Sequence, residues 1–217
     1  MSDDARPRVG LFVTCLVDAM RPSIGFAALR LLEEAGCAYE RILVDLSTGA
    51  QSAPDYRRIN PMAKVPALVD GDAVVAESAA ICAYVADRFP EAGLAPPVGD
   101  PARGRYLQWL FFSAGCVDPA FSERMNGWTT DSAATGWGSF DRVFAVLEEA
   151  LDGVKARGGW ILGERFSAAD VLLGIDLHYG KDIIGLVPRR PAFEDYVARC
   201  LDRPAFQRAL AIDAAGA

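Results

Sequence analysis

Residues 66–89 read PALVDGDAVVAESAAICAYVADRF. Two short apolar runs in this stretch flank the tripeptide Asp70-Gly71-Asp72, which is a strong signal for a hairpin turn. A helical pattern then opens at Ser78, and Pro90 stops it. The apolar runs are Pro66–Val69 and Ala73–Ala76. The stretch therefore predicts two antiparallel strands followed by one helix.

The chain before this stretch predicts a strand, a helix and a second strand. Val9–Thr14 is an apolar run suited to a buried strand, and Phe26–Ala35 has helical spacing. Arg41–Leu46 reads as the next strand. A strand, helix and strand this close together form a unit with parallel strands and a right-handed crossover. With the polar link 47–61, which has room for a short helix at 55–59, the order βαβ, link, ββα is the thioredoxin-like pattern.

The chain after this stretch predicts helices only. Residues 90–101 (PEAGLAPPVGDP) are rich in Pro and Gly and mark a linker. Beyond them, five segments carry apolar residues at helical intervals. They are residues 102–114, 140–155, 168–179, 192–201 and 205–212. The fold class is therefore α/β plus all-α: a thioredoxin-like domain over residues 1–89, the linker, and a helical bundle over residues 102–217.

The composition limits the classes of partner that we expect this protein to bind. The formal net charge is -7 and the basic residues are scattered, whereas a nucleic-acid site needs a concentrated basic face. No apolar run reaches the roughly 18 residues that a membrane span needs. The polar, acidic start MSDDARPRVG does not resemble a secretory signal. We therefore expect a cytoplasmic protein with no nucleic-acid partner and no membrane partner.

The cysteines and the single histidine limit the kinds of metal, disulfide and catalytic site that we expect. The five cysteines are Cys15, Cys37, Cys82, Cys116 and Cys200. They lie far apart and show no spacing typical of zinc ligands, so we expect thiols outside any disulfide or metal site. The one histidine, His178, excludes a site built from several histidines, and its helical surroundings favour a core or surface role. We expect no metal.

Three motifs resemble the signature segments of glutathione transferases. They are residues 60–68 (NPMAKVPAL), 77–81 (ESAAI) and 166–170 (FSAAD). Their order and spacing match that family over residues 38–210. The resemblance implies an enzyme with glutathione as co-substrate, which activates the glutathione thiol and adds it to a small hydrophobic electrophile, a detoxification reaction. It also implies a homodimer.

The resemblance assigns part of a glutathione-binding site to the first motif. Val65-Pro66 resembles the family's cis-proline turn, which leaves the amide and carbonyl of Val65 facing outward to pair with the cysteinyl backbone of glutathione. Lys64 and Gln51 are candidates for the glycyl carboxylate. On the residues alone, the alternatives are that Pro66 starts an edge strand and that Lys64 is a solvated cation.

Glu77 and Ser78 stand at the entrance of a predicted helix, where free amides and the helix dipole favour an anion. In the family that they resemble, the serine takes the γ-glutamyl carboxylate and the acid takes the ammonium group. The alternative is that Ser78 caps the helix and Glu77 is a solvated charge. Further along the chain, Ser167 and Asp170 have the spacing of a capping box, to which we assign no chemistry.

The loop expected to carry the catalytic residue departs from the family. A Tyr, Ser or Cys between the first strand and the first helix usually donates a hydrogen bond to the glutathione sulfur. Residues 15–25 (CLVDAMRPSIG) contain no Tyr. Ser23 is the first candidate for this donor, with a simple helix cap as its alternative. Cys15 is a candidate for a mixed disulfide or for thiolate stabilisation, with a buried thiol as its alternative.

The N-terminal segment has a second resemblance. Residues 8–37 resemble the opening of the cysteine-rich iron–sulfur subunits of lactate-utilisation and glycolate-oxidase systems. No paired-cysteine segment follows, so we expect no cluster, and a natural or engineered chimera would explain the two resemblances together. Two other functions stay open: a non-catalytic glutathione-binding scaffold, and thiol–disulfide exchange through Cys15.

The helical half supplies the electrophile pocket if the family layout holds. The candidates are Trp109, Phe112 and Cys116. Their alternative is a place in the helical core, where most helical aromatic residues lie. The Gly- and Thr-rich stretch Gly127–Gly138 (GWTTDSAATGWG) predicts a flexible lid.

Overall fold

The structure, a computed structural model, describes residues 9–13, 22–155 and 159–214. The chain divides into two compact units. The first unit runs to Ala92 and takes in the chain from Pro204 onward, and the second spans Gly93–Arg203. The first unit combines a sheet with helices, whereas the second is built from helices.

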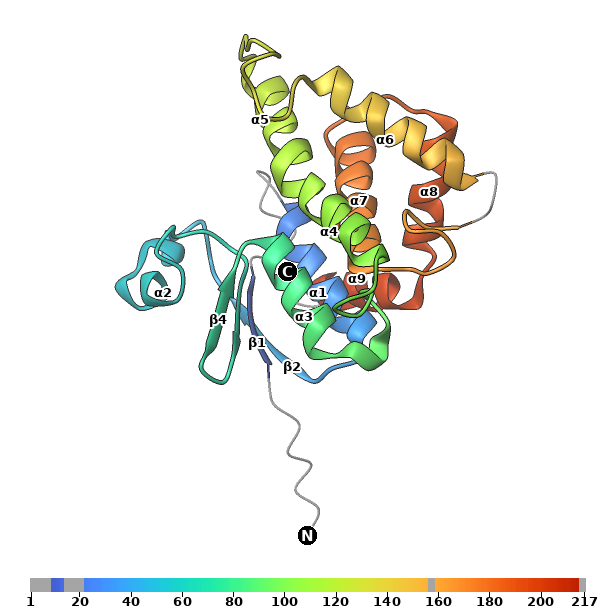
Figure 1. The fold of residues 1–217 in the computed structure, drawn as a ribbon. Coiled ribbons are helices and arrows are strands. Elements are labelled where there is room, and N and C mark those ends of the chain that lie inside the picture. Colours follow the sequence, from blue (N-terminus) through green and yellow to red (C-terminus); the bar gives the residue numbers. More distant parts are fainter. Residues whose placement is uncertain (1–8, 14–21, 156–158, 215–217) are drawn as a thin grey trace. The chain divides into compact units, whose positions relative to one another are not determined.

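The first unit is built on a four-stranded sheet with the strand order β2-β1-β3-β4 (Figure 1). The strands are β1 (Val9–Val13), β2 (Tyr39–Leu43), β3 (Ala67–Asp70) and β4 (Ala73–Ala76). β1 pairs in parallel with β2, and β3 pairs antiparallel with both β1 and β4. Leu11 at the middle of β1 lies opposite Arg41 on one side and Leu68 on the other. The predicted thioredoxin-like arrangement is confirmed.

Helices cover both faces of this sheet. The α-helices of the first unit are α1 (Pro22–Ala35), α2 (Pro54–Ile59), α3 (Ser78–Arg88) and α9 (Pro204–Ala214), of which α9 packs against α1. Figure 1 shows α1 and α3 on one side of the sheet and α2 on the other. Because successive strand residues point to opposite faces, Val9, Leu11 and Val13 are buried on one side. Phe12 points to the other side and meets Tyr56 of α2 edge-on, with ring centroids 6.0 Å apart.

Two predicted boundaries shift in the first unit. α1 begins at Pro22 rather than Phe26, because a proline fits the first helical turn, where its missing amide has no partner to lose. β2 ends at Leu43 rather than Leu46. The carboxylate of Asp45 accepts hydrogen bonds from the amide (2.9 Å) and the hydroxyl (2.6 Å) of Ser47, which turns the chain away from the strand.

The last helix, α9, belongs to the first unit. Its Phe206 ring meets Phe26 of α1 edge-on at 5.2 Å. Arg208 donates to the carboxylate of Glu33 (2.7 Å) and to the carbonyl of the same residue (3.0 Å). The sequence places residues 205–212 with the helical bundle, and the structure differs because helical periodicity shows that a helix has an apolar face but does not show which helix covers it.

The elements of secondary structure described in the second unit are helices, apart from one isolated bridge between Trp160 and Gly163. Its α-helices are α4 (Ala102–Phe112), α5 (Asp118–Asn126), α6 (Phe140–Lys155), α7 (Ala168–His178) and α8 (Pro191–Leu201). A π-helical turn, Ser113–Val117, joins α4 to α5, and a second one, Tyr179–Ile183, follows α7. None of the described helices is both long and apolar enough to cross a membrane.

Helix α7 is the centre of the second unit, and α4 and α8 pack against it. Every residue from Ala168 to Leu177 is buried. Its N-terminus carries the predicted capping box, which is confirmed. The buried carboxylate of Asp170 accepts hydrogen bonds from the amides of Ile161 (2.8 Å) and Ser167 (2.9 Å) and from the hydroxyl of Tyr196 (2.6 Å). These contacts tie three segments of the unit together.

Candidate functional site

A buried asparagine organises the turn between α2 and β3. Asn60 caps the C-terminus of α2 and is 3% exposed. Its side-chain Oδ1 accepts a hydrogen bond from the amide of Met62 (3.1 Å), and its Nδ2 donates to the carbonyl of Lys64 (2.7 Å). Ala63 takes a positive φ of 54° and donates its amide to the carbonyl of Asn60 (2.9 Å). One side-chain amide therefore holds both ends of the turn.

A tyrosine of α2 reaches the same carbonyl. The hydroxyl of Tyr56 donates to the carbonyl oxygen of Lys64 at 2.6 Å. The Tyr56 ring is buried in a small core with Val44 and Ala67, against which Val65 packs. The sequence predicts no role for Tyr56, although this residue lies on a predicted helix four residues before Asn60, so that the two side chains share one helix face.

The peptide bond between Val65 and Pro66 is cis. Pro66 is buried, and β3 begins one residue later at Ala67 as an inner strand between β1 and β4. The alternative that Pro66 starts an edge strand is therefore wrong. Among the described residues, neither the amide nor the carbonyl of the half-buried Val65 has a backbone hydrogen-bond partner.

Glu77 joins β4 to α3 in an unusual backbone conformation. Its φ of 70° and ψ of 125° lie outside the regions that residues other than glycine prefer. Glu77 occupies the N-cap position, but its exposed side chain makes no capping hydrogen bond. Ser78 is the first helical residue, so the alternative in which Ser78 is the cap is wrong. The first amides of α3 lack acceptors within the helix. They lie at this end of the helix, next to the Glu77 carboxylate, which makes no capping hydrogen bond.

Gln51 and Lys64 were predicted together for a carboxylate. Gln51 lies in a short 3₁₀ helix, Ala50–Ser52, and its Oε1 is buried without a hydrogen-bond partner in the described part of the chain. The Lys64 side chain is exposed. It comes from the turn that Asn60 holds, so its backbone is fixed while its ammonium group stays in solvent.

Of the two predicted catalytic residues, the structure describes the backbone position of Ser23 but not that of Cys15. Cys15 lies outside the described residues. Ser23 is the second residue of α1, within its first turn rather than before it, although its side chain is not among those described. The alternative role of Ser23 as an N-cap is wrong, because the cap position precedes Pro22.

The predicted pocket residues follow one another along a continuous helical path. Trp109 and Phe112 belong to α4, and Cys116 belongs to the π-helical turn that follows. Trp109 is buried and meets Phe112 edge-on at 5.3 Å. Phe112 and Cys116 are half-buried, and burial raises the pKa of the Cys116 thiol. Trp109 therefore has the burial of a core residue, while Phe112 and Cys116 keep some exposed surface.

The Gly- and Thr-rich stretch is tied down at two points. Both oxygens of the Glu123 carboxylate on α5 accept hydrogen bonds, one from the hydroxyl of Thr130 (2.6 Å) and one from the indole of Trp137 (2.8 Å). These two bonds, with that from Thr130 the larger cause, lower the pKa of Glu123. The contacts argue against a loose lid and indicate a loop fastened to α5.

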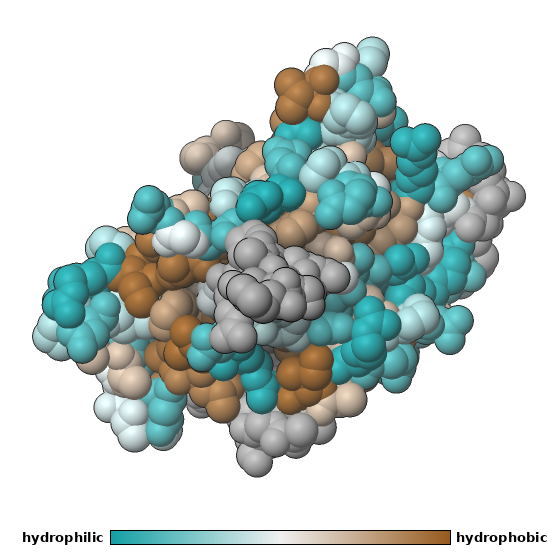
Figure 2. Space-filling view, turned by 90° about the horizontal axis from the view of Figure 1, so that it is seen from below, coloured by the Kyte–Doolittle hydropathy of each residue, from teal (hydrophilic) through white to brown (hydrophobic). Residues whose placement is uncertain are grey.

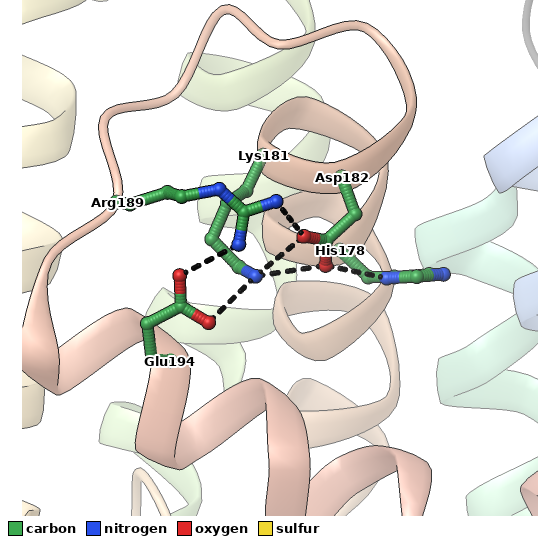
Figure 3. A network of polar contacts seen from close by, with 5 residues as sticks. All are labelled: His178, Lys181, Asp182, Arg189 and Glu194. Carbon is green, nitrogen blue, oxygen red and sulfur yellow. Dashed lines mark hydrogen bonds and ion pairs between the residues drawn. The ribbon is translucent and has the colours of Figure 1, made fainter.

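The only histidine of the chain takes part in a charged network at the end of α7 (Figure 3). His178 Nδ1 lies 2.9 Å from the carboxylate of Asp182. The buried ammonium of Lys181 contacts Asp182 (2.7 Å) and Glu194 (3.0 Å), and Arg189 contacts the same two acids at 2.9 Å each. Two basic residues thus balance two carboxylates, and His178 is joined to this network through Asp182. Among the described residues, no three His, Cys, Asp or Glu side chains are arranged so that they could hold a metal ion.

Comparisons with known proteins agree with this geometry. The family model "Glutathione S-transferase, N-terminal domain" matches residues 14–87. Glutathione S-transferase Z2 of Arabidopsis thaliana is 31% identical over 189 residues, which are 81% of this chain and 80% of that protein. Glutathione S-transferase 3 of Zea mays is 30% identical over 192 residues, 83% of this chain and 86% of that protein. The chain belongs to the glutathione S-transferase family.

A solved structure shares the whole fold. The sphingomonad glutathione S-transferase complexed with glutathione is 30% identical and has a TM-score of 0.74, covering 94% of this chain and 98% of its own. The family model begins at residue 14, so it includes most of the segment 8–37 that resembles iron–sulfur subunits. That second resemblance finds no support, and a chimeric origin is not needed to explain the chain.

Proposed function

We propose that this protein is a glutathione transferase that binds glutathione along Val65 and the N-terminus of α3, activates its thiol and adds it to a small hydrophobic electrophile. The observation that carries the proposal is the backbone of Val65, whose amide and carbonyl have no backbone hydrogen-bond partner in the part of the chain that the structure describes. It follows a turn held by Asn60 and precedes a strand that is already paired on both sides. A peptide ligand can complete the hydrogen bonding there without displacing any part of the described protein.

In the proposed site, the backbone, the ammonium group and both carboxylates of glutathione each have a partner of opposite charge or of complementary hydrogen-bonding type. The cysteinyl backbone pairs with the amide and carbonyl of Val65. The γ-glutamyl carboxylate takes the hydroxyl and amide of Ser78 at the positive end of α3, and the ammonium group takes the carboxylate of Glu77. The glycyl carboxylate takes Lys64 and Gln51. Glutathione is then the only small co-substrate that these residues require.

Thiol activation falls to the start of α1 in this proposal. Lowering a thiol pKa from about 8.5 to about 6.5 requires roughly 2.7 kcal/mol. One charge-assisted hydrogen bond supplies about 1.5–3 kcal/mol, and the end of a helix adds about 0.3–1 kcal/mol. Ser23, in the first turn of α1, is the proposed donor. Trp109, Phe112 and Cys116 of the second unit are the residues proposed to bind the electrophile.

Turnover of a chloronitrobenzene electrophile tests the activity. Ser23→Ala should reduce the rate at saturating glutathione while leaving glutathione binding intact, because the serine contacts only the sulfur. Cys15→Ser should leave this rate unchanged. If Cys15→Ser abolishes a glutathione-dependent disulfide reductase activity and the transferase reaction is absent, thiol–disulfide exchange replaces the proposed reaction. Glutathione binding without either activity would instead identify a non-catalytic scaffold.

The proposed assembly is a homodimer. Large hydrophobic side chains are exposed on both units, among them Met62, Val98 and Trp128. Figure 2 shows hydrophobic side chains gathered in patches on one face, with hydrophilic residues between them. Such patches are surface that a second subunit can bury. Light scattering gives the mass of the particle in solution and distinguishes one chain from two. A cytoplasmic location and a role in detoxification complete the proposal.

A further inference from the structure

We propose that Tyr56 is a positioning residue for glutathione, because its hydroxyl fixes the peptide unit that presents the Val65 amide to the ligand. The inference rests on the proposed function. Tyr56 itself need not touch glutathione: it acts through the carbonyl of Lys64. Tyr56 belongs to none of the sequence motifs, and its role follows from its hydrogen bond to the turn that precedes Pro66.

Two donors from one helix face converge on a single oxygen. Tyr56 and Asn60 are four residues apart on α2 and its C-cap, so their side chains leave the helix in the same direction. The Tyr56 hydroxyl lies 2.6 Å and the Asn60 Nδ2 lies 2.7 Å from the carbonyl oxygen of Lys64. A carbonyl oxygen has two lone pairs, so both are used, and the carbonyl is held toward α2.

This clamp also sets the direction of the next amide. The carbonyl of Lys64 and the amide of Val65 belong to one planar peptide unit, and in a trans unit the two groups point in opposite directions. The one cis bond of the described residues is the following one, between Val65 and Pro66. A Lys64 carbonyl held toward α2 therefore turns the Val65 amide away from α2. That amide would donate a hydrogen bond to the backbone carbonyl of the cysteinyl residue of glutathione.

The Tyr56 ring is fixed well enough to act as an anchor. It is 6% exposed and packs with Val44 and Ala67, and it meets Phe12 of β1 edge-on. Burial raises the pKa of Tyr56 to about 12, so the hydroxyl remains a donor throughout the range in which the enzyme is assayed. Without it, the peptide unit before Val65 keeps only the Asn60 contact and can rotate about its flanking single bonds.

Tyr56→Phe removes the hydroxyl and leaves the ring in its core. The dissociation constant for glutathione, measured by calorimetry, should rise about threefold to tenfold, the factor that one hydrogen bond carries. The KM for glutathione should rise by the same factor. The kcat at saturating glutathione should stay unchanged, since the chemistry at the sulfur does not involve Tyr56.

The matched control is Tyr84→Phe, which removes another hydroxyl of the same unit, the one that donates to Asp70 at 2.9 Å. Both variants should lose a similar amount of stability to urea, but Tyr84→Phe should bind glutathione like the unmodified protein. Equal glutathione affinity in the two variants would overturn the inference. Absence of glutathione binding by the unmodified protein would instead overturn the proposed function, so the two failures are distinguishable.

Discussion

Glu77 combines a strained backbone with an unused side chain. A residue other than glycine at a φ of 70° and a ψ of 125° costs on the order of 1–3 kcal/mol. The side chain does not repay this cost, because it makes no capping hydrogen bond and is exposed to solvent. The conformation instead places a carboxylate beside the positively polarised start of α3. A ligand with a cationic and an anionic group side by side suits this pair of charges.

Replacing Glu77 by Gln should weaken glutathione binding without weakening the fold. The variant keeps the shape and the backbone conformation but loses the charge that the ammonium group needs. We expect the dissociation constant for glutathione to rise about tenfold, the factor of one charge-assisted hydrogen bond, with an unchanged free energy of unfolding in urea. Glu91→Gln, an equal loss of charge at an exposed position of the same unit, is the control. Unaltered affinity in Glu77→Gln would remove Glu77 from the site.

Asp176 of α7 is a buried acid with few partners. It is 5% exposed, and its Oδ2 has no hydrogen-bond partner in the described part of the chain. Desolvation, followed by the nearby charge of Asp118, raises the pKa of this carboxyl well above its usual range, although the hydroxyl of Ser113 opposes the shift. The folded protein therefore holds this proton more tightly than the unfolded chain does.

This difference predicts a dependence of stability on pH. As pH rises above about 4, where an unfolded Asp loses its proton, the free energy of unfolding should fall until pH passes the raised pKa of Asp176. Asp176→Asn carries no such proton, so its stability should fall less between mildly acidic and mildly alkaline pH. Urea unfolding across that range measures both proteins. Asp152→Asn, an exposed acid of α6, should behave like the unmodified chain, and parallel curves for all three would contradict the prediction.

At the scale of elements, one carboxylate on α5 fastens the loop 127–138. Glu123 binds Thr130 near the start of the loop and Trp137 near its end. Within the loop, Asp131 accepts the amide of Ala133 (2.9 Å), and the hydroxyl of Thr135 donates to the carbonyl of Gly138 (2.7 Å). The loop is therefore ordered by its own polar side chains and held at both ends by a single residue outside it.

Glu123→Gln should release the loop. The amide side chain can accept only one of the two hydrogen bonds, so backbone amides of residues 127–138 should exchange with deuterium about threefold to tenfold faster, as expected for the loss of one hydrogen bond. Since the pKa of Glu123 is lowered, the same release in the unmodified protein should appear only as pH falls through that lowered pKa. Glu149→Gln on α6 is the control. Exchange that stays slow in Glu123→Gln would show that other contacts hold the loop.

Most of the elements and their order could be predicted from the sequence, because hydrophobic periodicity and turn residues are local signals. The hairpin around Gly71 and the helix that follows it are examples. Helix α5 was not predicted, since its sequence DPAFSERMN has too few apolar residues to show a helical period. The start of α1 at Pro22 was missed, since the apolar pattern begins four residues later. The cap at Glu77 was also missed, because a positive φ at a residue other than glycine depends on the surrounding fold and has no signal in the sequence.

At the scale of the whole molecule, the chain forms two units and ends in the first of them. The buried side chains Phe26, Arg30 and Phe206 join α1 to α9, with the Arg30 guanidinium 4.9 Å from the Phe206 ring centre. This pairing links residues far apart in sequence, so composition and periodicity could not reveal it. The role of Tyr56 could not be predicted for a related reason. Its hydroxyl donates to the carbonyl of Lys64, whose position depends on the turn and not on the helical pattern.

The most direct test of the account follows the backbone amides of Val65 and Ser78 while glutathione is titrated into isotope-labelled protein. We predict that both resonances shift and saturate together at millimolar or lower glutathione, with little change at Gly127 in the helical unit. Resonances of Val65 and Ser78 that remain still at millimolar glutathione, or saturating shifts confined to other residues, would contradict the claim that these two backbone positions hold the tripeptide.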